Sequence, residues 1–348
     1  MDEGSVSWRS PSNLAIVKYW GKYGVQLPRN PSLSLTLEKA YTETTIYYTP
    51  KDSKSEDGIA LQFFFEDQPN APFAEKVKQY LTGLKSVFPF LGQLELVIRS
   101  RNSFPHSSGI ASSASSMSAL ALCLCSLEQQ FFGTLSDEEA FRRKASFLAR
   151  LGSGSACRSV YPTMAIWGET GEVSGSSNYY AVPFAGQAHE AFHHYHDDIL
   201  IVSKGEKAVS SRAGHALMEE NEYASDRFAQ ARRRLHQLLR ILHTGDLEAF
   251  GELAEAEALT LHALMMTSTP PYLLLKPNTI ALIERVRAFR RGQKLPLYFS
   301  LDAGPNLHLL YPHSAAEAVQ AFVQEALAPL CENGQVIADR VGRGPEKF

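Results

Sequence analysis

The sequence predicts an α+β protein of two domains. Its 348 residues are enough for two domains, and its 44% hydrophobic and 20% charged content is ordinary for a globular protein. Strand-like segments precede most of the helical ones, without the regular alternation that a doubly wound parallel sheet requires. Residues 183–196 contain few periodic apolar positions. We therefore expect an N-terminal domain at 1–190 and a C-terminal domain at 191–348.

The first half of the chain combines strand candidates with helices. Apolar spacing predicts a helix at 73–88, and Ser136 and Glu139 have capping-box spacing before a second helix at 140–151. The continuous apolar run at 117–127 predicts a buried helix. Runs rich in β-branched and aromatic residues predict strands at 42–49, 61–65, 94–98, 161–167 and 178–182.

The second half is mainly helical. Apolar residues at helical spacing predict helices at 217–243, 247–265, 279–291 and 315–327. Strands are expected at 198–203, 297–301 and 307–311, and a glycine turn joins the last two. The order of these elements again favours the α+β class.

Composition and charge exclude several classes of protein. The formal net charge of −3 gives no general attraction to nucleic acid or to anionic membranes. No run approaches the ~20 apolar residues of a membrane span, and the N-terminus lacks a signal-peptide pattern, so we expect a cytoplasmic protein. The four cysteines have no C-x-x-C spacing, which predicts neither a disulfide framework nor a zinc knuckle.

Residues 189–193, His-Glu-Ala-Phe-His, match the H-E-x-x-H zinc pattern. That pattern requires a stable helix that presents both histidines. Here it lies between Gly186 and an expected strand, and a solvated polar linker explains it equally well. Further possible ligands are His194, His196 and Asp197, so the sequence leaves metal binding at this stretch open.

Residues 102–114, Asn-Ser-Phe-Pro-His-Ser-Ser-Gly-Ile-Ala-Ser-Ser-Ala, have the composition of a phosphate-binding loop. Small side chains let backbone N–H groups approach an anion, and the buried helix that follows would direct its positive end to the same place. Neither a P-loop motif nor a dinucleotide-binding motif occurs in the chain. An ordinary turn before a serine-capped helix is the alternative. The residues expected to hold phosphate are Pro105, Ser107, Ser108, Gly109, Ala111, Ser112 and Ser113.

Three other segments contain candidate site residues. Lys18 and Lys22 lie four positions apart, although solvated lysines on a strand edge would look the same. Arg158 follows a Gly- and Ser-rich segment and offers a fork suited to a carboxylate, unless the segment is only the end of a helix. Asp302 ends a predicted strand before Ala-Gly-Pro, where an aspartate is most often a turn former.

Together these segments resemble the diphosphomevalonate decarboxylase family. The loop reads Pro-x-x-x-Gly-Ile-x-Ser-Ser-Ala, which is similar to the phosphate-binding motif of the galactokinase, homoserine kinase, mevalonate kinase and phosphomevalonate kinase superfamily. The resemblance covers nearly the whole chain and implies a ribosomal protein S5 domain 2-like N-terminal domain and a ferredoxin-like C-terminal domain. The matching blocks, in the family's order and spacing, are 12–22, 27–37, 149–159 and 302–306.

The resemblance also implies roles for individual residues. Asp302, Lys18 and Arg158 would be catalytic, with Arg158 on the carboxylate that is lost. ATP would bind at the Ser-rich loop, and Ser113 is the expected Mg²⁺ ligand. The residues implied to bind the substrate are Asn13, Tyr19, Lys22, Ser153, Ser155 and Arg158.

The implied activity is ATP-dependent decarboxylation of (R)-5-diphosphomevalonate to isopentenyl diphosphate, with release of ADP, phosphate and CO₂. The protein would be a lyase of the mevalonate pathway of isoprenoid biosynthesis, dependent on ATP and Mg²⁺, and a homodimer. Two alternatives remain: a decarboxylase of the monophosphate or a mevalonate-type kinase, and a ligand sensor without activity. The sequence departs from the commonest family pattern at Pro31, His106 and Ser115–Ser116, which leaves the choice of substrate open.

Overall fold

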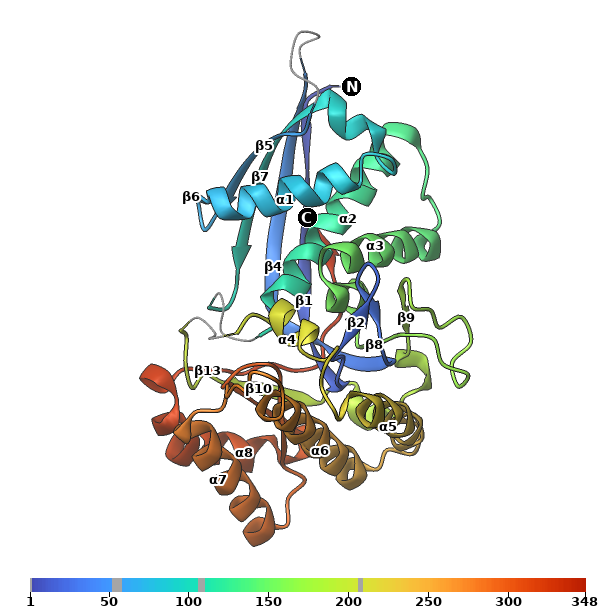
Figure 1. The fold of residues 1–348 in the computed structure, drawn as a ribbon. Coiled ribbons are helices and arrows are strands. Elements are labelled where there is room, and N and C mark those ends of the chain that lie inside the picture. The colour runs from blue at the N-terminus through green and yellow to red at the C-terminus, as the bar shows by residue number, and fades with distance from the viewer. Residues whose placement is uncertain (1, 52–57, 106–109, 206–208) are drawn as a thin grey trace.

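The computed structural model describes residues 2–51, 58–105, 110–205 and 209–348. Two β-sheets, each covered by helices, lie one above the other in Figure 1. The first sheet is mixed, because β5 runs parallel to β7 while its other strands pair antiparallel. The second sheet is antiparallel. The predicted α+β class is thus confirmed.

The first sheet has the strand order β14-β1-β4-β7-β5-β6, and β8 and β9 extend it from β4. Its two long strands are β1 (Gly4–Val17) and β4 (Ser32–Pro50), which pair along most of their length. The shorter strands are β5 (Ala60–Phe65), β6 (Gln68–Pro69), β7 (Leu94–Asn102), β8 (Met164–Trp167), β9 (Ala181–Pro183) and β14 (Glu346–Lys347). A separate hairpin consists of β2 (Lys22–Tyr23) and β3 (Leu27–Pro28).

Helices α1, α2 and α3 lie against the first sheet (Figure 1). The long helix α2 (Ser112–Phe132) packs on β1 and β4 and is buried over most of its length, as the apolar run at 117–127 predicts. Helix α1 (Ala71–Gly83) packs on β5, and α3 (Glu138–Gly152) packs on α2. Short 3₁₀ segments here are η1 (Pro89–Gln93), η2 (Gly154–Val160), η3 (Ala185–Gln187) and η4 (Glu190–Phe192).

The second sheet has the order β11-β12-β10-β13. Its strands are β10 (His196–Leu200), β11 (Tyr298–Leu301), β12 (Leu307–Tyr311) and β13 (Val336–Ile337). The helices of this part are α4 (Ser211–Ala216), α5 (Ala224–Thr244), α6 (Leu247–Met266), α7 (Pro277–Gln293) and α8 (Ala316–Phe322). The remaining short helical segments are η5 (His313–Ala315), η6 (Val323–Leu327), η7 (Ala328–Leu330) and η8 (Glu332–Gly334).

An apolar layer joins the two sheets. Leu14 and Leu33 of the first sheet belong to the same buried cluster as Phe250 of α6 and Tyr298 of β11. The end of the chain also returns to the first sheet, where β14 pairs with β1. The domain boundary expected near residue 190 stays a prediction.

Several predicted helices differ from the structure in their ends or caps. The helix predicted at 217–243 is α5, which begins only at Ala224, because the Asn221 side chain bonds to Tyr223 N and Leu264 O and interrupts the helix. The predicted capping box is wrong: Asp137, not Ser136, accepts the hydrogen bond from Ala140 N. The helix predicted at 73–88 ends at Gly83, and the one at 315–327 changes from α8 to a π turn after Phe322.

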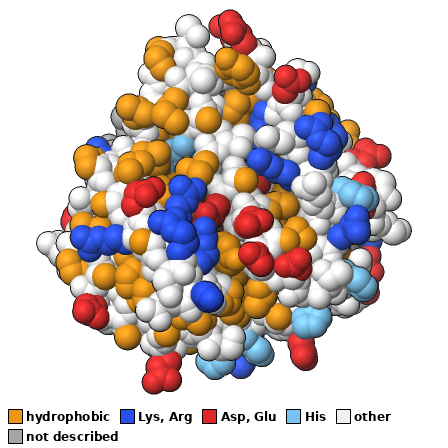
Figure 2. All heavy atoms as spheres, turned by 90° about the horizontal axis from the view of Figure 1, so that it is seen from below, with side chains coloured by type: hydrophobic (Ala, Val, Ile, Leu, Met, Phe, Trp, Pro, Cys, Tyr) orange, Lys and Arg blue, Asp and Glu red, His pale blue; other side chains and the backbone are white. Residues whose placement is uncertain are grey.

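No helix in the described part of the chain has the length and hydropathy that crossing a bilayer requires. Figure 2 shows the molecule from below, where Lys and Arg side chains lie beside Asp and Glu side chains. Ion pairs of this kind include those of Arg287 of α7 with Glu255 and Glu284. The face seen in Figure 2 therefore offers no continuous basic surface for a polyanion.

Candidate active site

The predicted site segments come together between the two sheets. Lys18, just after β1, donates from Nζ to Asp302 Oδ1 at 2.9 Å, although the two residues lie 284 positions apart in the chain. At the start of α2, Ser113 Oγ lies 3.1 Å from Ser153 Oγ. Asn13 of β1 donates from Nδ2 to the Ser155 main-chain oxygen at 3.2 Å. Residues from all four segments are thus linked by direct contacts into one region.

Lys18 and Asp302 form an ion pair whose two members differ in exposure. The Lys18 side chain is only 2% exposed and also donates to Ser300 Oγ at 2.9 Å, whereas the Asp302 side chain is 22% exposed. Reading Lys18 as a solvated surface lysine is therefore wrong. The buried ammonium holds a carboxylate that solvent and ligands can reach, which suits a group that accepts a proton.

The main chain of Asp302 makes the turn that the sequence suggests. Gly304 N donates to the Asp302 main-chain oxygen at 2.8 Å, and His262 Nε2 of α6 donates to the same oxygen at 3.1 Å. These contacts fix the backbone through main-chain atoms. They leave the Asp302 carboxylate available for the ion pair with Lys18.

Arg158 is a buried cation with neutral hydrogen-bond partners. Its side chain is 1% exposed and donates to Ser32 Oγ at 2.7 Å, to Ser34 Oγ at 3.0 Å and to Asn13 Oδ1 at 3.3 Å. Burial lowers its pKa from the ordinary value, and nearby groups, Asp302 among them, offset this only in part. Among the described residues no carboxylate forms an ion pair with Arg158. Its positive charge is therefore available to an anionic ligand.

Two close approaches determine where Arg158 lies. A Cβ added to Gly152 would come within 2.0 Å of Met117 Cε, and one added to Gly154 would lie 2.8 Å from Trp167 Cη2 and 2.9 Å from Tyr19 Oη. A side chain at Gly154 would clash with the rings of Trp167 and Tyr19, whereas one at Gly152 would displace the flexible Met117 side chain. This packing holds Arg158 in contact with the start of β4.

The N-terminus of α2 follows the predicted loop. Its N-cap residue is Ala111, at φ 46°, and no side chain of the described residues caps the helix, so the predicted alternative of a serine at the N-cap is wrong. Ser115 points inward and bonds to Thr42 Oγ1 at 2.6 Å, whereas Ser112 is half-buried and Ser113 exposed. The first backbone N–H groups of a helix have no partner within it, and they attract anions. Of the other predicted loop residues, Pro105 is half-buried, whereas Ser107, Ser108 and Gly109 lie outside the described residues.

Lys22 and Tyr19 lie on the side of the site nearest α4. Burial lowers the pKa of Lys22, and the charge of Arg212 lowers it further. Neither cation has an ion-pair partner in the part of the chain that the structure describes. The Tyr19 hydroxyl is buried without a hydrogen-bond partner among those residues, and its ring packs on Trp167 and His215. Arg212, on α4, was not predicted, because a single arginine after two serines matches no motif.

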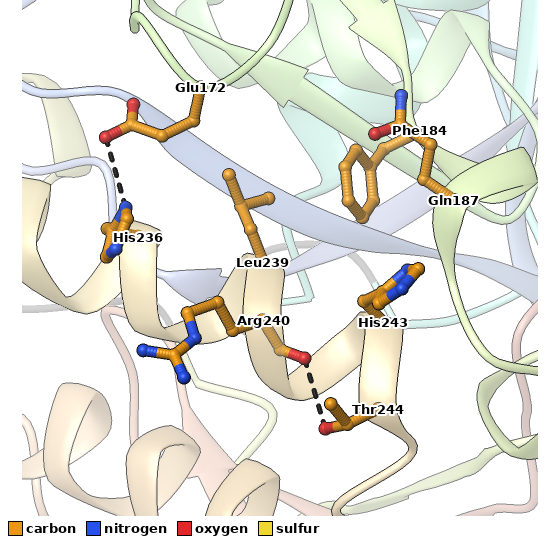
Figure 3. Close-up of a pocket in the computed structure, with 8 residues that line it drawn as sticks. All are labelled: Glu172, Phe184, Gln187, His236, Leu239, Arg240, His243 and Thr244. Carbon is orange, nitrogen blue, oxygen red and sulfur yellow. Dashed lines mark hydrogen bonds and ion pairs between the residues drawn. The ribbon is translucent and has the colours of Figure 1, made fainter.

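One cavity lies away from these residues and has a volume of about 410 Å³. Figure 3 shows it between α5 and the segment around Phe184, and His236 and Arg240 also line it. None of the predicted site residues lines it. The predicted site residues therefore come together away from this cavity.

The H-E-x-x-H stretch lacks the helix that zinc binding needs. His189 caps the three-residue η4, and its Nδ1 accepts a hydrogen bond from Ala191 N at 3.2 Å. Over residues 2–51, 58–105, 110–205 and 209–348, no group of three His, Cys, Asp or Glu residues could hold a metal ion. The geometry thus favours the polar-linker reading of this stretch.

Comparisons with known proteins agree with these contacts. The family model of the diphosphomevalonate decarboxylase-like N-terminal domain matches residues 10–179, and that of the mevalonate 5-diphosphate decarboxylase C-terminal domain matches 198–346. A diphosphomevalonate decarboxylase of Bos taurus is 30% identical over 338 residues, which cover 93% of this chain and 81% of the bovine protein.

Solved structures are similar over nearly the full length. Mevalonate diphosphate decarboxylase from Staphylococcus aureus has a TM-score of 0.84 at 28% identity, and the match covers 99% of this chain and 98% of that one. A structure described as MDDEF in complex with MVAPP, AMPPCP and magnesium has a TM-score of 0.81 at 29% identity, with the same coverage of both chains. On this evidence the chain belongs to the diphosphomevalonate decarboxylase family.

Proposed function

We propose that this protein catalyses the ATP-dependent decarboxylation of (R)-5-diphosphomevalonate to isopentenyl diphosphate in the mevalonate pathway. The observation that carries the proposal is the pairing of two features in one site: the Lys18–Asp302 ion pair and the buried Arg158, which forms no ion pair with a described carboxylate. The first suits phosphoryl transfer to a hydroxyl, and the second suits a substrate carboxylate. Together they suit a substrate that is phosphorylated at a hydroxyl and then loses its carboxylate.

The reaction divides between these groups. Asp302 accepts the proton of the C3 hydroxyl while the hydroxyl oxygen forms a bond to the γ-phosphorus of ATP, and ADP leaves. The Lys18 ammonium offsets the negative charge that gathers there. The C3 phosphate then departs with its bonding electrons, the C1–C2 bond breaks to release CO₂, and that electron pair becomes the C2–C3 double bond. Arg158 would hold the carboxylate in place for this step.

The residues present fit a nucleotide with its magnesium. The N-terminus of α2, which no described side chain caps, offers backbone N–H groups to phosphate, and Ser112 and Ser113 add hydroxyls. Magnesium bound to a nucleotide keeps phosphate oxygens and water as most of its ligands, so a few protein oxygens are enough. When bound, it would neutralise charge on the phosphates. The neighbour solved with MVAPP, AMPPCP and magnesium supports this part of the proposal.

Two cations and a hydroxyl suit the phosphate tail of the substrate. Lys22 and Arg212 lie close enough for their charges to interact, and both lack an ion-pair partner among the described residues. The buried Tyr19 hydroxyl can donate a hydrogen bond. Two uncompensated positive charges favour a diphosphate over a monophosphate. Asn13, Ser153 and Ser155, which contact the segments around Arg158 and α2, would complete the substrate site.

Substrate choice tests the proposal. Mevalonate, its 5-phosphate and its 5-diphosphate would each be offered with Mg·ATP, and CO₂ and ADP would be measured together. We expect both products from the diphosphate, at a kcat/KM well above that of the monophosphate. ADP without CO₂ from any of the three would favour a kinase, and neither product would favour a ligand sensor. The homodimer and the cytoplasmic location are proposed from the family resemblance and the sequence; sedimentation would test the first.

A further inference from the structure

Lys18 is held through its main chain as well as its side chain. Its N–H donates to Glu257 Oε2 of α6 at 2.8 Å. Its carbonyl oxygen accepts hydrogen bonds from Arg227 Nη2 of α5 at 3.2 Å and from Asn30 Nδ2 at 3.1 Å. Side chains from the second domain thus contact both polar groups of one peptide segment of the first.

These contacts replace a strand ladder that stops just before Lys18. The last paired residue of β1 is Val17, opposite Leu33, and Lys18 follows it outside the strand. A buried main-chain N–H or C=O without a partner is costly, so the position after the strand needs other partners. Glu257 and Arg227 supply them, although Glu257 lies 239 residues and Arg227 209 residues along the chain.

The two residues form a rigid unit. Arg227 donates to Glu257 Oε1 at 2.7 Å and to Oε2 at 2.6 Å, a bidentate pair whose side chains are 1% and 0% exposed. Burial raises the pKa of Glu257, but the hydrogen bonds and charge of Arg227 outweigh it, and the pKa lies below its ordinary value. A bidentate contact between two ionised groups fixes the orientation of both side chains better than a single hydrogen bond does.

We propose that Glu257 and Arg227 are positioning residues that set the place of Lys18 Nζ beside Asp302. The inference rests on the proposed function, because it assigns these residues to the same reaction. Neither touches Asp302 in the described structure; they act through the Lys18 main chain. We call the Glu257–Arg227 pair the clamp. If the clamp shifts, Lys18 Nζ moves relative to both Asp302 and Ser300, and a shift of about 1 Å can lower the rate roughly 10²-fold.

Arg234 provides a matched control. It also donates to Glu257 Oε1, at 2.7 Å, and so belongs to the same cluster of charges. It forms no contact with Lys18 among the described residues and is more exposed, at 19%. Arg227→Lys and Arg234→Lys both keep a positive charge, but only the first withdraws a donor from the Lys18 carbonyl.

The test compares these two variants by kcat, KM and pH profile. We expect Arg227→Lys to lower kcat for CO₂ release by about 10- to 100-fold, with KM for both substrates changed less than about threefold, because binding groups stay in place. Arg234→Lys should keep at least half of the wild-type kcat. Since a displaced Lys18 favours the Asp302 carboxylate less, the acidic limb of kcat/KM should move to higher pH only in Arg227→Lys. Three other titratable groups near Asp302 are unchanged in both variants: Arg158, His262 and His308.

A purely structural role would give a different result. If Arg227→Lys and Arg234→Lys lose kcat by the same factor, with the acidic limb unmoved in both, the inference is overturned. Should Arg227→Lys fail to fold, Glu257→Asp tests the Glu257–Arg227 pair through its other member, since it keeps the charge and shortens the side chain by one methylene. We expect the same lower kcat and the same shift of the acidic limb. If neither occurs, the inference is overturned. Wild-type enzyme that releases no CO₂ would contradict the proposed function itself, whereas active wild type with indistinguishable variants contradicts only the clamp.

Discussion

Replacing Arg158 by methionine distinguishes the effect of this buried charge on stability from its effect on catalysis. Arg158 is 1% exposed and has three neutral acceptors, of which two are closer than 3.1 Å. Losing these charge-assisted bonds would cost about 3–5 kcal/mol, counting about 1.5 kcal/mol or more for each of them. Removing a buried cation that has no ion-pair partner among the described residues returns several kcal/mol of desolvation free energy. We therefore expect the free energy of unfolding of Arg158→Met to stay within about 2 kcal/mol of wild type.

Catalysis should respond far more strongly. Removing the contact between the guanidinium and the substrate carboxylate in a site without water should cost about 3–5 kcal/mol. This corresponds to a loss of about 10²–10⁴ in kcat/KM. Nucleotide affinity should stay close to wild type, because α2 is unchanged. Arg158→Lys should recover only part of the activity, since an ammonium lacks the planar fork.

The assay combines urea unfolding, fluorescence titration of nucleotide and CO₂ release from the diphosphate. Arg150→Met is the matched control: Arg150 is also buried, at 2%, and donates to the main-chain oxygens of Val25 and Tyr179. We expect it to lower turnover much less than Arg158→Met. Turnover of Arg158→Met within about threefold of wild type, or lost ATP binding with intact substrate affinity, would refute the role given to Arg158.

Three other predictions follow from the structure. Asp302→Asn removes the carboxylate charge beside Lys18, so ADP formation and CO₂ release should fall together by roughly 10² or more; either activity near wild type would assign the proton transfer elsewhere. Ser113→Ala removes an exposed hydroxyl, so turnover should fall about tenfold, the worth of one hydrogen bond to a charged group, with an unchanged unfolding midpoint; unchanged kcat and ATP affinity would remove Ser113 from the site. Burial raises the pKa of Asp198 from 3.8 to about 6. The folded state then binds more protons than the unfolded state between about pH 4 and pH 6, so stability falls as pH rises through this window. Asp198→Asn should raise the free energy of unfolding at pH 8 by about 1–3 kcal/mol, measured by urea denaturation. If wild type and Asp198→Asn depend on pH equally, the raised pKa of Asp198 is contradicted.

Residues in short motifs were predictable because their chemistry is local. Ser113 lies in a run of small residues before an apolar helix, Arg158 follows two glycines, and Asp302 ends an apolar strand. The sequence suggested each as a site residue, and the structure brings their segments into contact. The sequence cannot show that Arg158 forms no ion pair with the described carboxylates, since partners depend on tertiary packing.

Other parts of the fold and site leave little sequence signal. Strand β1 was missed because Pro11 and several serines interrupt it, and its pairing with β4 is irregular there. Glu257 lies in an Ala-rich helix, where a glutamate resembles part of a solvated face, yet its side chain is fully buried. Its partner Lys18 is 239 residues away, so no local pattern relates the two.

The coupling of ATP use to CO₂ release tests the central claim most directly. Purified enzyme would be given Mg·ATP and (R)-5-diphosphomevalonate labelled at its carboxyl carbon, and ADP, phosphate and labelled CO₂ would be counted over the same interval. The site described here, with Asp302 for phosphoryl transfer and Arg158 for the carboxylate, predicts one CO₂ for each ADP and none without ATP. ADP formed without CO₂, or CO₂ released without ATP, would contradict it.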